Sequence, residues 1–319
     1  MPEPRPRVVI TERLDPVCAD WLAERCDVRW TDHTDPAAVA EALAGARAAV
    51  VRTYTRVDAA FLAAGPRLKV VGRAGVGLDN FDLDACRRAG VRVVHTPDAN
   101  TQAVVEYVTG LMLDAVRPRT PLPAGADAAT FHALRKTEVG AEWGGRTFGT
   151  LGFGRIGKRV GAVAHALGMR VLACDVLDPG PLRRAVDYPV ELVEHAELYA
   201  RSDVLSVHAD GRPENRRLVG PAAFAGLKPG VLLINAARGV LVDHDALGRW
   251  FADHPSARAF LDVHDPEPPA PDHPLHALPN VTLLPHLASR TGPALANMSW
   301  VVRDVAAVLA GDAPRHAAV

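Results

Sequence analysis

Apolar residues along the chain alternate between two spacings. Short, mostly apolar runs fit buried strands, and longer stretches with apolar residues three or four positions apart fit helices. Strands alternating with helices indicate parallel sheets that are covered by helices on both faces. The rhythm begins at Arg7, breaks over residues 117–146 and resumes at Thr147. The sequence therefore predicts an α/β protein with two doubly wound parallel-sheet units in tandem.

The first unit is predicted to hold five strands and the helices between them. The strands are Arg7–Ile10, Asp27–Trp30, Ala48–Arg52, Leu68–Arg73 and Val91–Val94. The helices are Asp15–Arg25, Pro36–Ala44, Asp58–Ala63 and Asp82–Ala89, and Val104–Val116 links this unit to the next.

The second unit is predicted to hold six strands. They are Thr147–Leu151, Met169–Cys174, Asp203–His208, Val231–Asn235, Ala257–Asp262 and Val281–Leu284. Helices are expected before Gly168, near Val190–Tyr199, near Pro221–Gly226, at Asp243–Asp253 and at Thr291–Ala310. Prolines exclude a regular helix after Arg117, so residues 117–146 are predicted to be an extended loop with a short helix around Phe131–Lys136. A loop this long usually has a function or forms an interface.

The clearest candidate site is Thr147–Asp175, a strand, a glycine-rich turn, a helix and a second strand that ends in an acid. Gly152 allows the tight turn, Gly154 lets the backbone approach a pyrophosphate, and Gly157 lets the helix pack close to the strand. The first N–H groups of the helix favour the diphosphate charge. This arrangement predicts a dinucleotide site.

Asp175 lies 18 residues after the last glycine of that turn. Its carboxylate can accept hydrogen bonds from both ribose hydroxyls of an adenosine, and it repels a 2′-phosphate. The predicted cofactor is therefore NAD rather than NADP. The alternative is a glycine-tolerant turn followed by a surface aspartate.

Composition excludes several classes of protein. The 36 basic and 37 acidic residues nearly cancel, so no nucleic-acid or membrane surface is expected. There is no apolar run near the length of a membrane span, and the first seven residues lack an apolar signal core. The four cysteines show no metal-ligand spacing and fit buried thiols in a reducing cytoplasm. A cytoplasmic protein without a metal site is expected.

Polar side chains follow several predicted strands, where open parallel sheets bind ligands. Arg238 follows one strand of the second unit, Glu267 follows another, and His286 follows the last. Each has a plainer explanation when taken alone: a loop arginine, a solvated acid and a polar strand end. Their convergence on the sheet that carries the glycine turn favours a common site.

At this point the chain resembles the D-2-hydroxyacid dehydrogenases, the 3-phosphoglycerate dehydrogenase branch in particular. The resemblance covers nearly the whole chain. Its motifs are Gly72–Asn80, Asn100-Thr101 before a helix with Glu106, Gly152–Gly157, Asn235–Gly239, Asp262–Pro268 and Pro285-His286.

The resemblance implies an NAD-dependent oxidoreductase that interconverts a D-2-hydroxy acid and its 2-keto acid. The catalytic residues of the family fall on Arg238, which would bind the carboxylate and the reacting oxygen, on His286, the acid–base, and on Glu267, which would orient the imidazole and favour its protonated form. Cofactor contacts are expected from Gly152, Gly154, Arg155, Ile156, Gly157, Asp175, His208, Ala236 and Asp262. Asp262 could instead cap a loop. Substrate contacts are expected from Arg52, Arg73, Gly75, Val76, Gly77 and Asn100.

The resemblance also implies a division into domains. Residues 1–99, completed by 291–319, would form a flavodoxin-like substrate-binding domain. Residues 100–290 would form a Rossmann NAD domain, with a cleft between the two that closes on the substrate. The family dimerises through its NAD domains, so a homodimer is expected, with residues 117–146 as part of the interface.

One segment departs from the family pattern. His208–Pro213 reads HADGRP, where the family has an apolar residue and Pro-Leu-Thr after the histidine. The sequence therefore does not determine which cofactor contacts this segment makes.

The sequence determines the reaction class more closely than it determines the substrate. Arg52 and Arg73 could bind an anionic tail, as in 3-phosphoglycerate or a phosphonate, or could pair with acids such as Asp79 or Asp82. Two other functions also fit the motifs: an NAD-sensing, corepressor-like binding protein, and a dehydrogenase of an inorganic oxyanion such as phosphite.

Overall fold

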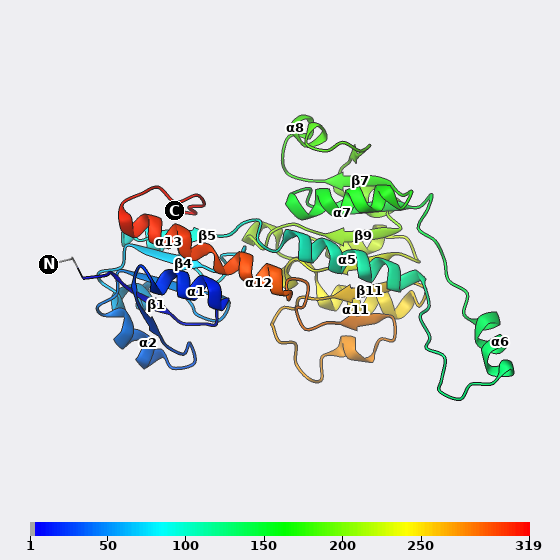
Figure 1. Ribbon diagram of the computed structural model, residues 1–319. Coiled ribbons are helices and arrows are strands. Elements are labelled where there is room, and N and C mark those ends of the chain that lie inside the picture. Colours follow the sequence, from blue (N-terminus) through cyan, green and yellow to red (C-terminus); the bar gives the residue numbers. More distant parts are fainter. Residues whose placement is uncertain (1–3) are drawn as a thin grey trace. The chain divides into compact units, whose positions relative to one another are not determined.

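The computed structural model describes residues 4–319, and the chain forms two compact units (Figure 1). The first unit ends at Gln102 and is completed by Ser289–Val319, and the second is Ala103–Ala288. Each unit is built around its own sheet, and all strand pairs in both sheets are parallel. The predicted α/β class with two doubly wound sheets is confirmed.

The sheet of the first unit has five strands in the order β2-β1-β3-β4-β5, which is the flavodoxin-like order. The direction of winding reverses between β1 and β3, so the ends of these two strands flank the switch point where such sheets bind ligands. The strands are β1 (Arg7–Ile10), β2 (Asp27–Trp30), β3 (Ala48–Val51), β4 (Val70–Arg73) and β5 (Arg92–His95).

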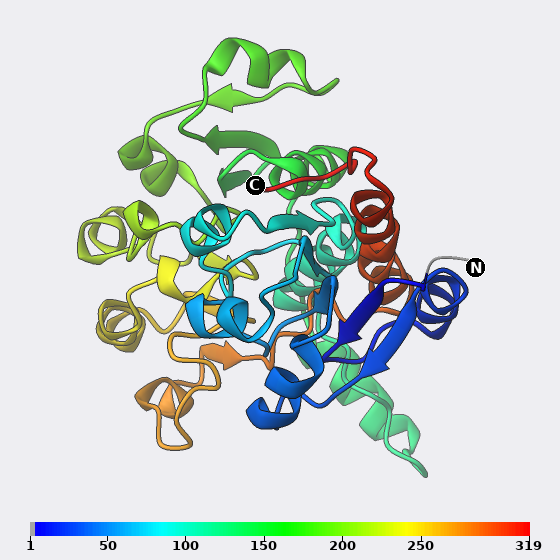
Figure 2. The same cartoon turned by 90° about the vertical axis from the view of Figure 1, so that its left-hand side faces the viewer.

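Helices cover both faces of this sheet because its strands are apolar on both sides. On one face Val8 and Ile10 of β1 share a core with α1 and with Val305 of α13, and α12 packs on α1. The other face packs against α2, α3 and α4. Figure 2 shows the C-terminal helices and α1 on the same side of these strands. The helices are α1 (Pro16–Ala23), α2 (Pro36–Leu43), α3 (Ala59–Ala64), α4 (Leu83–Arg88), α12 (Gly292–Ser299) and α13 (Val301–Ala310).

The sheet of the second unit has seven strands in the order β12-β11-β10-β9-β6-β7-β8. Counted from β6, this is the Rossmann order 3-2-1-4-5-6 with one more strand at the edge. The switch point lies between β6 and β9. The strands are β6 (Thr147–Leu151), β7 (Arg170–Cys174), β8 (Glu191–Leu192), β9 (Val204–Val207), β10 (Leu232–Asn235), β11 (Arg258–Leu261) and β12 (Val281–Leu283).

In the second unit α5 and α7 cover one face of the sheet, and α9, α10 and α11 cover the other. Figure 1 shows α6 on a long connection that leads away from the sheet of its unit, and α6 has no buried residue. The helices are α5 (Thr101–Val116), α6 (Ala128–Thr137), α7 (Arg155–Ala166), α8 (Pro179–Arg184), α9 (His195–Arg201), α10 (Pro221–Gly226) and α11 (His244–Asp253). Short 3₁₀ turns lie at Pro213–Asn215, Gly239–Leu241 and Pro274–Ala277.

The structure differs from the predicted elements in three places. Residues predicted as one helix at Val190–Tyr199 form the short strand β8 and then α9, and α8 was not predicted. The final pattern is two helices, α12 and α13, separated at Trp300. The C-terminal residues run antiparallel beside β5, where Ala318 N–H donates to Val93 O at 2.8 Å.

Candidate active site

The glycine turn after β6 has the geometry that its three glycines require. Gly152 has φ +94°, which disfavours other residues, and a Cβ there would lie 2.7 Å from the backbone of His208 and Ala209. A Cβ on Gly157 would lie 2.3 Å from Gly152 O. The turn and the start of α7 can therefore pack this closely only with glycine at both positions.

The start of α7 is open for a ligand. Gly154 is its N-cap and supplies no side-chain cap, and a Cβ there would meet nothing within 4 Å. Arg155 and Ile156 are the first two residues of the helix. The helix N-terminus thus presents backbone N–H groups beside open space, which is the cradle that a diphosphate needs.

Asp175 directly follows β7 and lies beside the same turn. Its Oδ2 accepts from Phe153 N–H at 2.7 Å, and its Oδ1 accepts from Leu177 N–H at 3.0 Å. The acid is thus held at the edge of the glycine turn, where an adenosine ribose would lie. The residues present fit a dinucleotide.

His208 follows β9, on the other side of the switch point. Its Nε2 lies 2.8 Å from Ser206 Oγ, and burial lowers its pKa to about 4, so the ring is neutral at neutral pH. In the departing segment, Arg212 Nε donates to Asp210 Oδ1 at 2.6 Å and Asn215 Nδ2 donates to Asp210 O at 3.0 Å. A cluster of polar side-chain contacts therefore replaces the apolar residue and Pro-Leu-Thr of the family pattern.

The loops that carry Arg238, Glu267 and His286 follow β10, β11 and β12, which are neighbours in the sheet. Because the strands are parallel, the three loops meet at one edge of the second unit. The loops also touch: a Cβ on Gly239 would lie 2.0 Å from the carbonyl of His264. Gly239 is therefore required for the Arg238 loop to pack on the Glu267 loop.

Glu267 and His286 form a direct pair. His286 Nδ1 lies 2.6 Å from Glu267 Oε1, and both side chains are 41% exposed. Since an ionised carboxylate only accepts, Nδ1 carries the proton of this bond and Nε2 is left as the acceptor nitrogen. His286 has φ +55°, which is uncommon for a residue other than glycine.

Asp262 is fully buried and holds the segment after His286. Its two oxygens accept from Leu287 N–H and Ala288 N–H, both at 2.8 Å, and Oδ1 also accepts from Tyr107 OH at 3.1 Å. Burial and the Asp262 charge raise the pKa of Tyr107, so the phenol remains a donor. These bonds correspond to the loop-capping alternative for Asp262.

Two further side chains, from the motifs Asn235–Gly239 and Asp262–Pro268, shape the catalytic loops, although no role was predicted for them. Asn235 Nδ2 donates to Arg238 O at 2.9 Å, and its Oδ1 accepts from Ala237 N–H at 3.1 Å, which closes the turn through Ala236. His264 Nε2 donates to Leu284 O at 2.7 Å, which ties the loop after β11 to the loop after β12. Their position after a strand is visible in the sequence, but their hydrogen-bond partners are not.

In the first unit, Arg52 follows β3 and Arg73 ends β4. Arg52 Nη1 donates to Arg13 O at 3.2 Å, and Arg73 Nη1 donates to Ala74 O at 3.0 Å. Burial, reinforced by the charge of Arg290 and opposed by Glu12, lowers the pKa of Arg52.

One N–H group of the glycine loop after β4 is already bonded within the loop. Gly75 N–H donates to Arg73 O at 2.8 Å, so a carboxylate would have to use the N–H groups of Val76 and Gly77. Asn100 lies just before α5, and its Oδ1 is buried without a hydrogen-bond partner.

Other features of the described residues add little chemistry. All four cysteines are free and buried. Residues 4–319 contain no group of three or more His, Cys, Asp or Glu side chains that could hold a metal ion. None of the helices in this range has the length and apolar character needed to cross a bilayer.

A Rossmann sheet with a glycine turn at its switch point, and an imidazole–carboxylate pair at the same end of its strands, defines a dinucleotide-dependent dehydrogenase class. Residues 109–288 match the family model described as D-isomer specific 2-hydroxyacid dehydrogenase, NAD binding domain. The chain belongs to the D-isomer-specific 2-hydroxyacid dehydrogenase family, and the predicted NAD cofactor is confirmed.

Known relatives match nearly the whole chain. D-3-phosphoglycerate dehydrogenase of Mycobacterium tuberculosis is 39% identical over 310 residues, which cover 96% of this chain and 57% of that protein. (S)-sulfolactate dehydrogenase of Chromohalobacter salexigens is 37% identical over 93% of this chain and 96% of its own length. The crystal structure of the TT0316 protein from Thermus thermophilus superimposes with a TM-score of 0.84 at 32% identity, covering 98% of this chain and 100% of that one. This chain thus spans little more than half of the phosphoglycerate dehydrogenase.

Proposed function

We propose that the protein is an NAD-dependent dehydrogenase that interconverts a D-2-hydroxy acid and the corresponding 2-keto acid. The observation that carries the proposal is the 2.6 Å contact between His286 Nδ1 and Glu267 Oε1, on the sheet that holds the glycine turn. Membership of the family supports the same reaction class.

The roles follow from the bonds that each side chain already makes. Bound NAD supplies the carbon that accepts the hydride. His286 takes the hydroxyl proton at Nε2 during oxidation and returns it to the carbonyl oxygen during reduction, because Glu267 already occupies Nδ1. Glu267 stabilises the imidazolium that forms during oxidation, since it accepts the hydrogen bond from Nδ1–H in both the neutral and the charged ring. Asp262 keeps the His286 segment in place through its bonds to Leu287 and Ala288.

Arg238 binds the carboxylate that lies beside the reacting carbon. A guanidinium offers a planar fork of donors to a carboxylate, which fixes the orientation of the acid as well as its position. Asn235 closes the turn beneath Arg238 by two hydrogen bonds, so the arginine projects from a rigid backbone. We infer that Val76, Gly77 and Asn100 are the substrate contacts of the first unit.

We further propose that the substrate has an anionic tail, bound by Arg52 and Arg73. Two curated relatives are named for acids with such a group, a phosphate in phosphoglycerate and a sulfonate in sulfolactate. The buried Nε of Arg52 has no hydrogen-bond partner, and a tail oxygen would supply one.

NADH oxidation with a panel of 2-keto acids tests this function. The panel contains 3-phosphohydroxypyruvate, sulfopyruvate, hydroxypyruvate and pyruvate, and phosphite with NAD serves as a separate arm. We expect the highest kcat/KM with a charged tail. No turnover with any keto acid, together with tight NAD binding, would instead support an NAD sensor, and NADH formation from phosphite alone would support an oxyanion dehydrogenase.

Asp175→Ala is expected to weaken NAD binding and to relax the rejection of NADP. The substitution removes the acceptor of the ribose hydroxyls and the charge that repels a 2′-phosphate. The ratio of kcat/KM for NAD to that for NADP should fall by about tenfold or more, which corresponds to roughly 1.4 kcal/mol of lost discrimination. Asp178→Ala, three residues further along the chain, is the control. If the ratio does not move, Asp175 does not select the cofactor.

We propose a homodimer in the cytoplasm, with residues 117–146 in the interface. In support, α6 buries none of its residues, and Leu122, Phe131 and Val139 are 53%, 46% and 80% exposed. Apolar side chains gathered on one exposed segment are typical of protein interfaces. Sedimentation velocity measures this directly, and a monomer at micromolar concentration would contradict it.

A further inference from the structure

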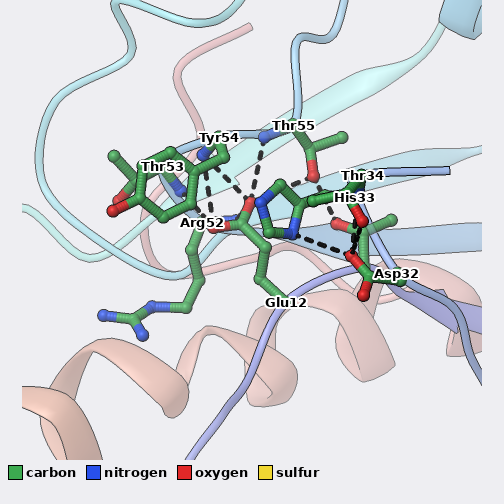
Figure 3. A network of polar contacts seen from close by, with 9 residues as sticks. Glu12, Asp32, His33, Thr34, Arg52, Thr53, Tyr54 and Thr55 are labelled. Carbon is green, nitrogen blue, oxygen red and sulfur yellow. Dashed lines mark hydrogen bonds and ion pairs between the residues drawn. The ribbon is translucent and has the colours of Figure 1, made fainter. Parts of the chain in front are cut away.

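A carboxylate of the protein itself closes the loop that carries Arg52. The N–H groups of four consecutive residues, Arg52 to Thr55, all donate to Glu12 at 2.9–3.2 Å, and Thr55 Oγ1 donates at 3.0 Å (Figure 3). Successive backbone N–H groups that converge in this way form an anion-binding nest. In this unit the nest already holds an anion.

The position of this nest in the fold is informative. Glu12 follows β1 by two residues, and Arg52 directly follows β3. These strands flank the switch point of the first sheet, which is the place where open α/β sheets bind a ligand. The site where a phosphate group would bind in such a sheet is therefore occupied by Glu12.

The opposite side of the same loop is held by a second side chain. Asn80 Nδ2 donates to Arg52 O at 3.2 Å and to Thr55 O at 2.6 Å. Thr11 and Thr55 also share a buried hydrogen bond of 2.6 Å between their hydroxyls. The loop is thus clamped through its N–H groups by Glu12 and through its carbonyls by Asn80.

Glu12 is suited to remain an anion in this place. Burial alone would raise its pKa, but the N–H groups of Thr53, Thr55, Arg52 and Tyr54 together lower it below its usual range. The backbone N–H groups of residues 52–55 all donate to Glu12 and are not available to another anion. The guanidinium of Arg52, with its unpartnered buried Nε and with Arg290 nearby, is then the donor that the loop has left for another anion.

We propose that Glu12 acts as a built-in anion that positions Arg52, and that this arrangement sets the selectivity of the protein for substrates with an anionic tail. Glu12 is a positioning residue that does not bind the substrate. Its carboxylate occupies the N–H groups of the nest, so that the substrate cannot bind there, and it fixes the backbone from which the Arg52 side chain extends. The inference rests on the proposed function, since it assigns how that site recognises one end of its substrate.

Glu12→Gln tests the proposal with little change in shape. The amide keeps one acceptor oxygen and turns an NH₂ group towards N–H donors, so the loop loses its clamp. We expect KM for 3-phosphohydroxypyruvate to rise by about 10–100-fold, as for the loss of one charged hydrogen bond. KM for hydroxypyruvate, kcat and the Kd for NADH should each change by less than about threefold, because the reacting end and the cofactor are bound by other loops.

Asp32→Asn is the matched control. Asp32 lies in the same polar network and accepts from Thr34 N–H and Thr34 Oγ1, both at 2.8 Å, but it binds no N–H of the Arg52 loop (Figure 3). It should leave both KM values unchanged. Glu12→Asp retains the charge on a shorter side chain, so its KM for 3-phosphohydroxypyruvate should lie between those of the wild type and Glu12→Gln.

A readout without substrate separates positioning from loss of fold. In hydrogen exchange, the amides of residues 52–55 should lose protection in Glu12→Gln and keep it in Asp32→Asn, while amides of β3 and β4 remain protected. Equal rises in KM for both keto acids, or unchanged protection at residues 52–55, would overturn the proposal. If the wild-type protein shows no preference for keto acids with a charged tail, the proposal of an anionic-tail substrate is wrong. The wild-type kinetics alone give this result, before any variant is compared.

Discussion

Replacing His286 with alanine is expected to lower kcat by about 10²–10⁴-fold, which is the range for loss of a general acid–base. The Kd for NAD should change little, because the glycine turn and Asp175 follow different strands from His286. The pair with Glu267 is the reason to expect an effect at the upper end. Alanine leaves the Glu267 carboxylate without its partner at 2.6 Å, so the site loses the group that carries the proton, and the Glu267 charge has no imidazolium left to stabilise.

Steady-state kinetics in both directions, with NAD binding measured separately, would check this result. His276→Ala is a suitable control, since His276 is exposed in the 3₁₀ turn Pro274–Ala277 of the same unit. Turnover that is unchanged in His286→Ala would remove His286 from the mechanism. A loss of turnover accompanied by an equal loss of NAD binding would show damage to the fold of the second unit.

The second large effect is expected from Arg238→Lys, which keeps the charge and removes the fork of donors. We expect kcat/KM to fall by about 10²–10³-fold, comparable to removal of one preorganised donor in a transition state. The fall should appear in kcat as well as KM, since the resemblance to the family also implies a contact of Arg238 with the reacting oxygen. Asn235 and the turn it closes are untouched by this substitution, so the backbone should stay in place.

Arg249→Lys, on the exposed side of α11, provides the control for the charge-conserving change. The same panel of keto acids serves for both variants. A lysine variant with wild-type kcat/KM would mean that a point charge suffices at this position, and the bidentate role of Arg238 would then be wrong.

Local signals in the sequence predict much of this fold. Aspartates at the helix starts, such as Asp35, Asp58 and Asp243, do accept hydrogen bonds from the first turn, and the apolar runs lie in the sheets. The misplaced helix at Val190–Tyr199 has a physical cause. Its first residues satisfy their backbone groups by pairing with β7, Leu172 with Glu191 and Ala173 with Leu192, and this tertiary pairing overrides the local pattern.

The residues that support the site are harder to predict than the residues expected to act in it. His286 and Glu267 lie in recognisable motifs, and the structure brings them together. Tyr107 reaches Asp262 over 155 positions, and Glu12 reaches Arg52 over 40. Such pairs depend on the order of strands in a sheet, and a single sequence carries no local signal for it.

The helix α6 carries a consequence for how the protein behaves on dilution. A helix of ten residues is marginal in water by itself, and α6 has no buried side chain within its own chain. In the proposed dimer, its helical order and its contact with a second copy should therefore form one coupled equilibrium. At concentrations far below the dissociation constant for that contact, α6 should lose its helical signal while both sheets stay folded.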